Sequence, residues 1–262
     1  LKFQISVGSM TYLHENRVIW VTGAASGIGK AVAEEIVSEG GLVLGSDLPT
    51  ADFSWADGLE NVKYITGSVS DEEHNALAVE TAINEFGHLD GAVLNAGMAG
   101  RIDLFEGDMG FFDEVMDVNV RAVILGIREC ASVMRPGSAI TATASTSGMR
   151  GDPGMWVYNT SKAAVINLVR STSIDLAAKG IRINAVCPGP TETGMTTRFD
   201  GEPYDNMRRR IPLQRWGNAL EIATAHSFLL SSKASFITGA HLPVDGGMSA
   251  NSGQFTPPPF QL

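Results

Sequence analysis

The chain has 262 residues, of which 44% are hydrophobic and 18% charged, and a formal net charge of −10 at pH 7. This composition is too apolar for a disordered chain, yet no apolar run reaches the roughly 18 residues that a membrane span needs. The acidic balance, with no basic stripe to offset it, predicts neither a nucleic acid nor a membrane surface as a partner.

The two cysteines and the first residues give further expectations. Cys130 and Cys187 lie in apolar segments and belong to no Cys-x-x-Cys or Cys/His cluster. We therefore expect reduced, buried thiols in a cytoplasmic protein, and no metal site. Residues 1–9, which precede Met10, are interpreted as an expression remnant and take no part in the fold prediction.

Short apolar runs alternate with segments of helical periodicity along the chain. The predicted strands are residues 17–22, 42–46, 62–66, 91–94, 139–144, 182–187 and 241–244. The predicted helices are residues 28–38, 70–86, 111–134, 156–178 and 218–230, and Ser70-Asp71-Glu72-Glu73 reads as a capping box. This alternation predicts right-handed βαβ crossovers, a parallel sheet covered on both faces and a single α/β domain over residues 10–248. The tail, residues 249–262, carries three prolines and is expected to be disordered or to lie on a neighbouring subunit.

A glycine-rich segment joins the first predicted strand to the first predicted helix. It reads Thr22-Gly-Ala-Ala-Ser-Gly-Ile-Gly29. Glycines at Gly23, Gly27 and Gly29 permit a tight turn and let a pyrophosphate approach the backbone, next to the positive end of the helix. A structural glycine turn is the alternative, but the strand before and the helix after are the context that a dinucleotide site requires.

Asp47 ends the second predicted strand and indicates which dinucleotide binds. A carboxylate there can accept both ribose hydroxyls and would repel a 2′-phosphate. No Arg or Lys lies at residues 45–48, and Ser26 stands where a cation would help to hold that phosphate. NAD is therefore predicted in preference to NADP, with a solvated aspartate at a strand end as the alternative interpretation of Asp47 alone.

The candidate catalytic residues are Asn119, Ser145, Tyr158 and Lys162. Tyr158 and Lys162 are four residues apart at the start of a predicted helix, so they share one face. A free phenol has a pKa of roughly 10, and a nearby ammonium and a cationic nicotinamide would both lower it towards neutrality. Ser145 follows the preceding strand, where its hydroxyl can hold a substrate oxygen. The Tyr-x-x-x-Lys spacing alone is also compatible with a pair on a helix surface.

With these residues the chain resembles the short-chain dehydrogenase/reductase family in its ordinary, non-extended form, from about Arg17 to Met248. The matching motifs are Thr22-Gly-x-x-x-Gly-x-Gly29, Asn95-Ala96-Gly97, Asn119, Ser145, Tyr158-Asn-Thr-Ser-Lys162, Asn184, Pro188-Gly189, Ile237-Thr-Gly239 and Val244-Asp-Gly-Gly247. The resemblance implies a doubly wound Rossmann sheet of seven strands that binds a nicotinamide cofactor. It also implies a homotetramer or a homodimer packed through the helices at 111–134 and 156–178.

The resemblance also implies residue roles. Tyr158 would be the general acid/base, and Ser145 would fix the reacting oxygen. Lys162 would bind the nicotinamide ribose and lower the pKa of Tyr158, and Asn119 would position a water that links Lys162 to solvent. The residues predicted to bind the cofactor are Gly23, Ser26, Gly27, Ile28, Gly29, Asp47, Leu48, Ser68, Val69, Asn95, Ala96, Gly97, Tyr158, Lys162, Pro188, Gly189, Thr191 and Thr193.

One departure from the family pattern concerns the adenine end, where Ser68 occupies the position of the usual acid, so weaker adenine binding is expected. Three variable stretches, residues 98–108, 146–157 and 190–216, are expected around the nicotinamide, the last of them as a mobile lid. Their soft apolar side chains are Met98, Met149, Met155, Trp156, Met195 and Phe199, which either face an apolar or ring-containing substrate or pack the loops. Arg101 and Arg150 either grip a substrate carboxylate or are solvated.

The sequence therefore predicts an NAD-dependent enzyme that interconverts a small secondary alcohol and a ketone. Tyr158 would take the hydroxyl proton while the hydride passes to the cofactor. The alternative from another class is a non-catalytic NAD-binding regulator on the same fold, which the intact set of Asn, Ser, Tyr and Lys disfavours. An NAD-using isomerase or lyase is a third option, although such relatives have longer chains.

Overall fold

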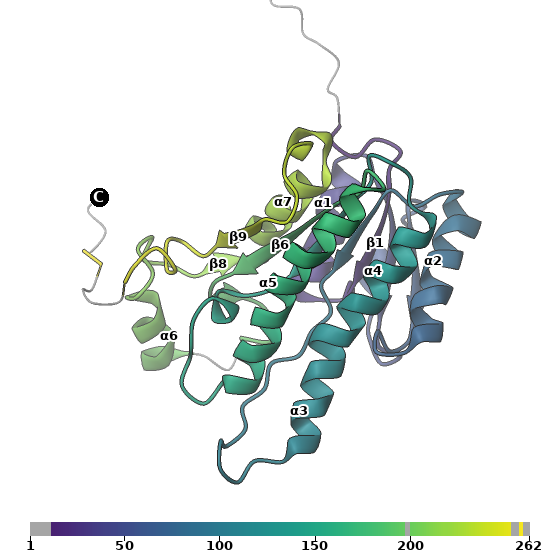
Figure 1. Cartoon of the computed structure of the whole chain (residues 1–262). Coiled ribbons are helices and arrows are strands. Elements are labelled where there is room, and N and C mark those ends of the chain that lie inside the picture. The colour runs from purple at the N-terminus through teal and green to yellow at the C-terminus, as the bar shows by residue number, and fades with distance from the viewer. Residues whose placement is uncertain (1–11, 197–199, 253–256, 259–262) are drawn as a thin grey trace, which may run out of the picture.

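Seven parallel strands form the central sheet of the computed structural model, which describes residues 12–196, 200–252 and 257–258 (Figure 1). The strands are β1 (Val18–Thr22), β2 (Leu42–Asp47), β3 (Val62–Thr66), β4 (Gly91–Leu94), β5 (Ala139–Thr143), β6 (Arg182–Pro188) and β9 (His241–Val244). Their order is β3-β2-β1-β4-β5-β6-β9, so the direction of winding reverses between β1 and β4. The predicted doubly wound α/β fold is confirmed, and the predicted strands differ from the observed ones only at their ends.

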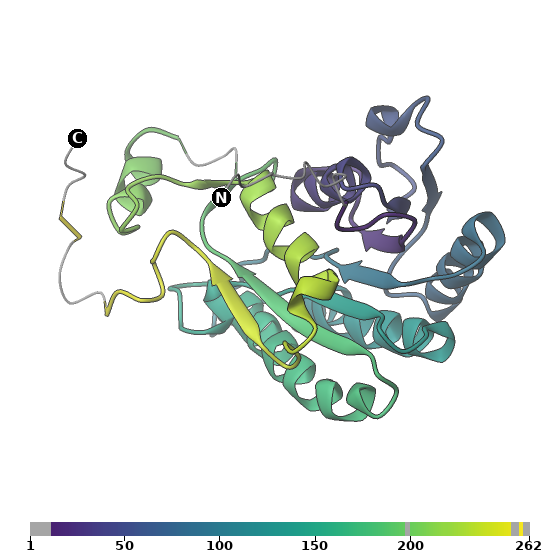
Figure 2. The same cartoon turned by 90° about the horizontal axis from the view of Figure 1, so that it is seen from above.

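Helices cover both faces of this sheet. One face carries α1 (Gly27–Ser38) and α7 (Ala219–Leu230), and the other carries α2 (Glu72–Phe86), α4 (Ala122–Val133) and α5 (Trp156–Ala177) (Figure 2). Side chains alternate along β1, as the pleat of a strand requires. Val18 and Trp20 pack into the core beneath α2, α4 and α5, whereas Ile19 and Val21 pack into the core beneath α1 and α7. Because both faces are buried, the strands read as continuous apolar runs.

The predicted long helix at 111–134 is interrupted in the structure. Helix α3 (Met109–Met116) is followed by a π-helical turn (Asp117–Arg121) and then by α4. In the π turn the Ala122 N–H donates to the Asp117 carbonyl, five residues back instead of four. Such turns insert one extra residue into a helix and are frequent at functional sites. The turn contains Asn119, one of the predicted catalytic residues.

The predicted capping box at 70–73 is wrong. Helix α2 begins at Glu72, and Asp71 at its N-cap position makes no capping hydrogen bond through its side chain. The Ser70 N–H, which a capping box would pair with the Glu73 carboxylate, donates to the Ser68 hydroxyl at 3.2 Å. Next to it, the Arg121 guanidinium donates to the Ser70 carbonyl at 2.7 Å and to the Glu72 carboxylate at 3.0 Å. A capping box is present at the start of α7, where the Asn218 and Glu221 side chains bond each other's backbone N–H groups.

A small subdomain lies beyond the carboxyl ends of the strands, within the stretch that was predicted to form a lid. It consists of the two-residue strands β7 (Thr191–Glu192) and β8 (Gly217–Asn218), which pair in parallel, and of α6 (Gly201–Arg208). Tyr204 of α6 stacks on Trp216 with ring centroids 4.9 Å apart. Arg208 pairs with Asp205, and α6 has no buried residue. Residues 197–199, including the candidate pocket residue Phe199, lie outside the described residues.

Within the described part of the chain, no helix is both long and apolar enough to cross a membrane. The same residues contain no group of three or more His, Cys, Asp or Glu side chains arranged to hold a metal ion. Residues 1–9 and most of the tail after residue 252 lie outside the described residues, so their predicted nature stays a prediction.

Acid is expected to destabilise this fold through His14. Its side chain is fully buried, and its Nε2 lies 2.9 Å from Ser227 Oγ. Burial, with a smaller contribution from Arg17, lowers the pKa of His14 to about 4. Between pH 6.5 and 4 the unfolded chain binds a proton there that the folded chain does not, so the unfolding free energy falls as the pH falls. Urea unfolding across this window should show that slope, and His14→Gln should reduce it. An equal slope in both proteins would contradict the assignment.

Candidate active site

A cavity with a volume of about 1100 Å³ lies at the carboxyl ends of the strands. It spans the point between β1 and β4 where the winding reverses, which is where open α/β sheets bind their ligands. Nearly all of the predicted site residues line it, from several separate segments of the chain. They are Gly23, Ser26, Gly27, Ile28, Asp47, Leu48, Ser68, Val69, Asn95, Ala96, Gly97, Ser145, Tyr158, Lys162, Pro188, Gly189, Thr191 and Thr193.

The glycine turn has the geometry of a phosphate cradle. Gly23 and Gly27 have φ angles of +68° and +55°, which side-chain-bearing residues rarely adopt. Gly29 is buried behind the turn, and a Cβ there would collide with the Gly23 carbonyl and lie 2.7 Å from Asn95 Nδ2. Ser26 occupies the N-cap position of α1 but makes no capping hydrogen bond through its side chain. The turn therefore leaves open space at a positive helix end, which fits the pyrophosphate of a dinucleotide.

Asp47 is fixed at the end of β2, beside this turn. One carboxylate oxygen accepts from the Ala25 N–H at 3.0 Å and the other from the Leu48 N–H at 2.8 Å. Among the described residues that line the cavity, Lys162 is the only cation, and it comes from α5. The region around Asp47 therefore offers a carboxylate for ribose hydroxyls and no partner for a 2′-phosphate.

Leu48, Ser68 and Val69, which were predicted to lie near the adenine, line the cavity close to Asp47. Leu48 is 55% exposed, so its side chain is available to cover a flat ring, and Val69 is buried. The Ser68 hydroxyl accepts from the Ser70 N–H at 3.2 Å, so its oxygen is already used to shape the loop. It retains its own proton as a donor. The predicted departure from the family pattern at this position therefore leaves one hydrogen bond available.

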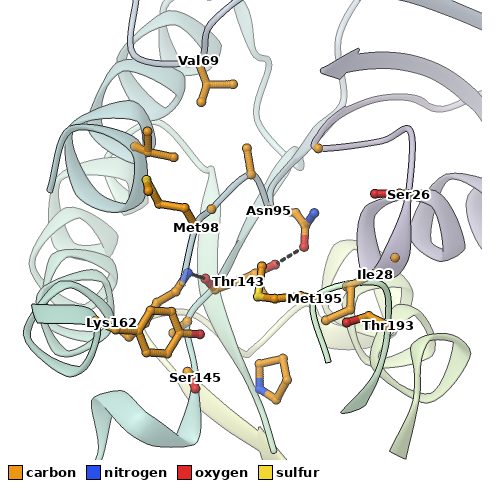
Figure 3. Close-up of a pocket in the computed structure, with 18 of the residues that line it drawn as sticks. Ser26, Ile28, Val69, Asn95, Met98, Thr143, Ser145, Lys162, Thr193 and Met195 are labelled. Atoms are coloured by element: carbon orange, nitrogen blue, oxygen red, sulfur yellow. Dashed lines mark hydrogen bonds between the residues drawn. The ribbon is translucent and has the colours of Figure 1, made fainter. Parts of the chain in front are cut away.

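Ser145, Tyr158 and Lys162 meet at the opposite end of the cavity. Ser145 lies two residues after the end of β5, at the N-cap of a short 3₁₀ turn (Thr146–Gly148). Its hydroxyl accepts a hydrogen bond from the Ser147 N–H at 3.1 Å. Lys162 Nζ donates to the Thr143 carbonyl at 2.9 Å and lies 5.8 Å from the centre of the Tyr158 ring. Figure 3 shows Ser145, Thr143 and Lys162 around the same space. The helical spacing of Tyr158 and Lys162 thus brings both side chains to one site.

The expected lowering of the Tyr158 pKa is wrong for the protein alone. Burial raises the pKa of Tyr158, a hydrogen bond with Ser145 opposes this rise, and the Asp152 carboxylate adds to it. Burial also lowers the pKa of Lys162 to about 8. The reason is that both side chains are removed from water, and desolvation disfavours the charged form of each. The ammonium is turned towards the Thr143 carbonyl, so its attraction for a phenolate does not outweigh burial.

Asn119 lies behind the cavity wall. Its amide nitrogen donates to the Met98 carbonyl at 2.9 Å and to Ser161 Oγ at 3.0 Å, and its oxygen accepts from the Met98 N–H at 2.8 Å. Both amide hydrogens are therefore used within the protein. A Cβ on Gly97 would lie 3.1 Å from Asn119 Oδ1 and 3.2 Å from Lys162 Nζ, so these two atoms approach the same point.

The segment after β6 closes the nicotinamide end and reaches across to the glycine turn. Thr193 Cβ lies 3.6 Å from where a Gly27 Cβ would be. The Thr191 hydroxyl donates to the Gly189 carbonyl at 2.9 Å, which shapes this segment. Figure 3 shows Thr193 and Met195 facing Ile28 across the opening.

Several pocket predictions differ from the structure. Of the candidate substrate-facing side chains, Met98 and Met195 line the cavity, whereas Met149, Met155, Trp156, Arg101 and Arg150 are not among its lining residues. Trp156 instead stacks on Phe112, with ring centroids 5.9 Å apart, and its Nε1 donates to the Ile102 carbonyl. Arg150 donates to the Met248 carbonyl.

Sequence reasoning missed one helical face that lines the cavity. Its members recur at helical spacing along α3 and the π turn, namely Gly110, Asp113, Glu114, Asp117 and Val118. A largely polar stripe of this kind was the available signal. Periodicity alone does not distinguish a stripe that faces solvent from one that faces a cavity. Thr143 and Ala144 are further lining residues that were not predicted, whereas Pro190 and Thr196 belong to the predicted stretch 190–216.

Comparisons with known proteins agree with this geometry. A family model described as Enoyl-(Acyl carrier protein) reductase matches residues 23–249. The 2-(R)-hydroxypropyl-CoM dehydrogenase of Xanthobacter autotrophicus is 37% identical over 248 residues, which cover 90% of this chain and 99% of that protein. The meso-2,3-butanediol dehydrogenase of Serratia marcescens is 33% identical and covers 92% of this chain and 97% of its own length. A short-chain dehydrogenase from Burkholderia cenocepacia, solved in complex with NADP, has a TM-score of 0.85 and 31% identity over 90% of this chain and 99% of that one. The chain therefore belongs to the short-chain dehydrogenase/reductase family.

Proposed function

We propose that this protein interconverts a secondary alcohol and the corresponding ketone with a nicotinamide dinucleotide, and that it prefers NAD. The observation that carries the proposal is the continuity of one cavity, with Asp47 and the glycine turn at one end and Ser145, Tyr158 and Lys162 at the other. The names of the two relatives support the substrate class, since a 2-hydroxypropyl group and 2,3-butanediol both carry secondary alcohols.

The bound dinucleotide would supply the chemistry of hydride transfer, which no side chain can provide. The glycine turn would hold its pyrophosphate, Asp47 its adenosine ribose and Lys162 its nicotinamide ribose. Ser145 would donate a hydrogen bond to the substrate oxygen and so fix it beside the Tyr158 hydroxyl. Tyr158 would accept the alcohol proton during oxidation and return it during reduction of the ketone.

In the protein without cofactor, the shifted pKa values of Tyr158 and Lys162 indicate which charge state the bound cofactor would have to stabilise. Burial raises the pKa of Tyr158, so the phenol is protonated and suited to donate to a ketone oxygen. For alcohol oxidation the positive charge of the oxidised nicotinamide would stabilise the phenolate, as an opposite charge nearby does. Lys162 would relay the proton towards solvent through a water that donates to Asn119 Oδ1 and lies near Gly97.

This function is tested with a panel of cyclic, aromatic and steroidal secondary alcohols. Each alcohol is incubated with the protein and NAD, and the absorbance of reduced nicotinamide is followed. Formation of reduced cofactor that depends on both protein and alcohol is expected. Dinucleotide binding without turnover of any alcohol or ketone would instead favour a non-catalytic NAD-binding regulator. Reaction without net release of reduced cofactor would favour an isomerase or a lyase.

Asp47 is expected to determine the preference for NAD. The wild-type protein should bind NADH more tightly than NADPH, because the Asp47 carboxylate accepts ribose hydroxyls and repels a 2′-phosphate. Asp47→Ser should weaken NADH binding about tenfold, which corresponds to about 1.4 kcal/mol, and should narrow the gap to NADPH. Fluorescence titration with each reduced cofactor measures both affinities. The matched control is Asp57→Ser, which changes an exposed aspartate in the loop after β2. Equal affinity of the wild type for both cofactors would contradict the role of Asp47.

The substrate is proposed to be apolar or ring-containing where it meets the lid. Met98 and Met195, which line the cavity, support this because thioether side chains adapt to irregular apolar shapes. A cytoplasmic location is also proposed, and it is supported by Cys130 and Cys187, which are free and buried thiols.

We propose in addition that the protein is a homotetramer or a homodimer. Large apolar side chains on the outer surface support this assembly. Ile174 of α5 is 74% exposed, Ile124 of α4 is 39% exposed, and Phe236 before β9 is fully exposed. Exposed apolar side chains of this size are typical of faces that pack against another subunit.

A further inference from the structure

A buried histidine outside the cavity is joined to the cofactor site by hydrogen bonds. His226 of α7 is fully buried. Its Nδ1 lies 2.8 Å from Thr141 Oγ1 and its Nε2 lies 3.2 Å from Thr143 Oγ1, and both threonines belong to β5. The Thr143 hydroxyl also lies 3.0 Å from Asn95 Oδ1. Polar groups of this kind are costly to bury, so each of these contacts constrains its neighbours.

The direction of every bond in this network follows from one backbone carbonyl. The Thr22 carbonyl can only accept, so the Asn95 group 3.1 Å from it is the amide nitrogen. The Asn95 oxygen therefore faces Thr143, and the Thr143 hydroxyl must donate to it. A hydroxyl has one proton, so His226 Nε2 must in turn donate to Thr143.

The second ring nitrogen of His226 completes the network. His226 Nδ1 carries no proton when Nε2 carries one, so it accepts from the Thr141 hydroxyl. Burial lowers the pKa of His226 to about 3, which keeps the imidazole neutral and the tautomer fixed. The complete path of donors runs from Thr141 through His226 and Thr143 to Asn95, and it ends at Thr22.

The end of this path supports the glycine turn. Thr22 is the last residue of β1, directly before Gly23, and Asn95 Nδ2 lies where Cβ atoms on Gly23 and Gly29 would have to fit. The Asn95 and Ala96 N–H groups also donate to the Thr22 hydroxyl, at 2.8 and 2.9 Å. The Asn95 side-chain amide is thus one of three groups that join the end of β4 to the turn.

Thr143 links the same network to the other end of the cavity. Its hydroxyl takes part in the path from His226 to Asn95, while its carbonyl accepts from Lys162 Nζ at 2.9 Å. Figure 3 shows Thr143 between Asn95 and Lys162, with both bonds drawn. One residue of β5 is therefore in contact with a group beside the glycine turn and with the cation at the nicotinamide end.

We propose that His226 is a positioning residue for the dinucleotide site, acting through Thr143 to fix the Asn95 amide against the glycine turn. The proposal rests on the proposed function, because the ligand concerned is the dinucleotide. Removal of the path would leave the fold in place but let the Asn95 amide rotate. Binding of the dinucleotide would then include the cost of ordering that amide.

Two matched threonine variants separate positioning from general packing. Thr143→Val removes the hydroxyl that joins His226 to Asn95. Thr141→Val removes a hydroxyl from the same strand and the same histidine, but the bonds from His226 through Thr143 to Asn95 remain. Each variant leaves one ring nitrogen of His226 without its partner. Both should lower the thermal unfolding midpoint of the ligand-free protein, but only Thr143→Val should weaken NADH binding, by fivefold or more. The readouts are fluorescence titration with NADH in the absence of alcohol and thermal unfolding.

A second pair of variants tests His226 itself. His226→Gln retains one donor and one acceptor and should restore NADH affinity to within about twofold of wild type, whereas His226→Leu should resemble Thr143→Val. This pair keeps the proposal testable if Thr143→Val fails to fold. Equal NADH affinity in the wild type, Thr143→Val and His226→Leu would overturn the proposal, and so would equal weakening by the two threonine variants. If the wild type binds neither NADH nor NADPH, the proposed function itself fails, which is a distinct result.

Discussion

Replacing Tyr158 with phenylalanine is expected to abolish turnover, with kcat lowered by about 10²–10⁴-fold. In the proposed function the phenol exchanges the proton with a substrate oxygen held by Ser145. Lys162 is proposed to have another role, since its Nζ donates to the Thr143 carbonyl and would hold the nicotinamide ribose with its remaining protons. The ring itself is retained, so NADH affinity by fluorescence titration should stay within about twofold of wild type. Steady-state kinetics with saturating NAD and the best alcohol of the panel measure the loss.

The control for this change is Tyr64→Phe. Tyr64 lies on β3, half exposed, with its ring stacked on Phe53 at 4.4 Å between centroids, and it does not line the cavity. Removal of the Tyr64 hydroxyl should leave kcat unchanged. Residual activity of Tyr158→Phe above a tenth of wild type would show that another group exchanges the proton. A parallel loss of NADH binding would show a structural role for the phenol instead.

Gly29→Ala is expected to eliminate measurable dinucleotide binding and to destabilise the fold. A methyl group at this position would collide with the Gly23 carbonyl and with Asn95 Nδ2, and neither can move without opening the turn. Insertion of a methyl group into a packed site typically costs about 1–3 kcal/mol of unfolding free energy. Because the displaced atoms form the wall of the cradle, NADH affinity should fall by more than about 10²-fold, that is by about 2.8 kcal/mol or more. Urea unfolding and NADH titration measure the two effects.

Lys30→Ala is the matched control on the same helix. Lys30 follows Gly29 directly and forms an exposed pair with Glu34 at 3.1 Å, and exposed pairs contribute little to stability. This variant should retain both stability and NADH affinity. Unchanged NADH binding in Gly29→Ala would mean that the turn does not form the phosphate site.

The strands and the glycine turn could be predicted because their signals are local. A strand buried on both faces reads as an apolar run, and the glycines of a tight turn occur where side chains do not fit. The four-residue spacing of Tyr158 and Lys162 was sufficient for the same reason, since helical geometry alone brings the two side chains to one face.

The differences arose where contacts from distant segments shape the local structure. The local pattern at Ser70 predicts a capping box, but the helix begins at Glu72, where Arg121 bonds the Ser70 carbonyl and the Glu72 carboxylate. The apolar periodicity of residues 111–134 predicts one continuous helix, but a π turn places Asn119 so that its amide bonds Met98 and Ser161. Neither tertiary partner can be read from the segment itself.

The sequence by itself determined the fold class, the glycine turn and the pairing of a phenol with an amine, because each depends on local spacing. Only the tertiary structure decided the direction in which the pKa values of that pair shift and the support of the turn. Burial by the surrounding elements raises the pKa of Tyr158 and lowers that of Lys162. The path from His226 to Asn95 joins β4, β5 and α7, which lie far apart in the chain. Desolvation and hydrogen bonding both depend on what folding brings together, and spacing along the chain does not encode it.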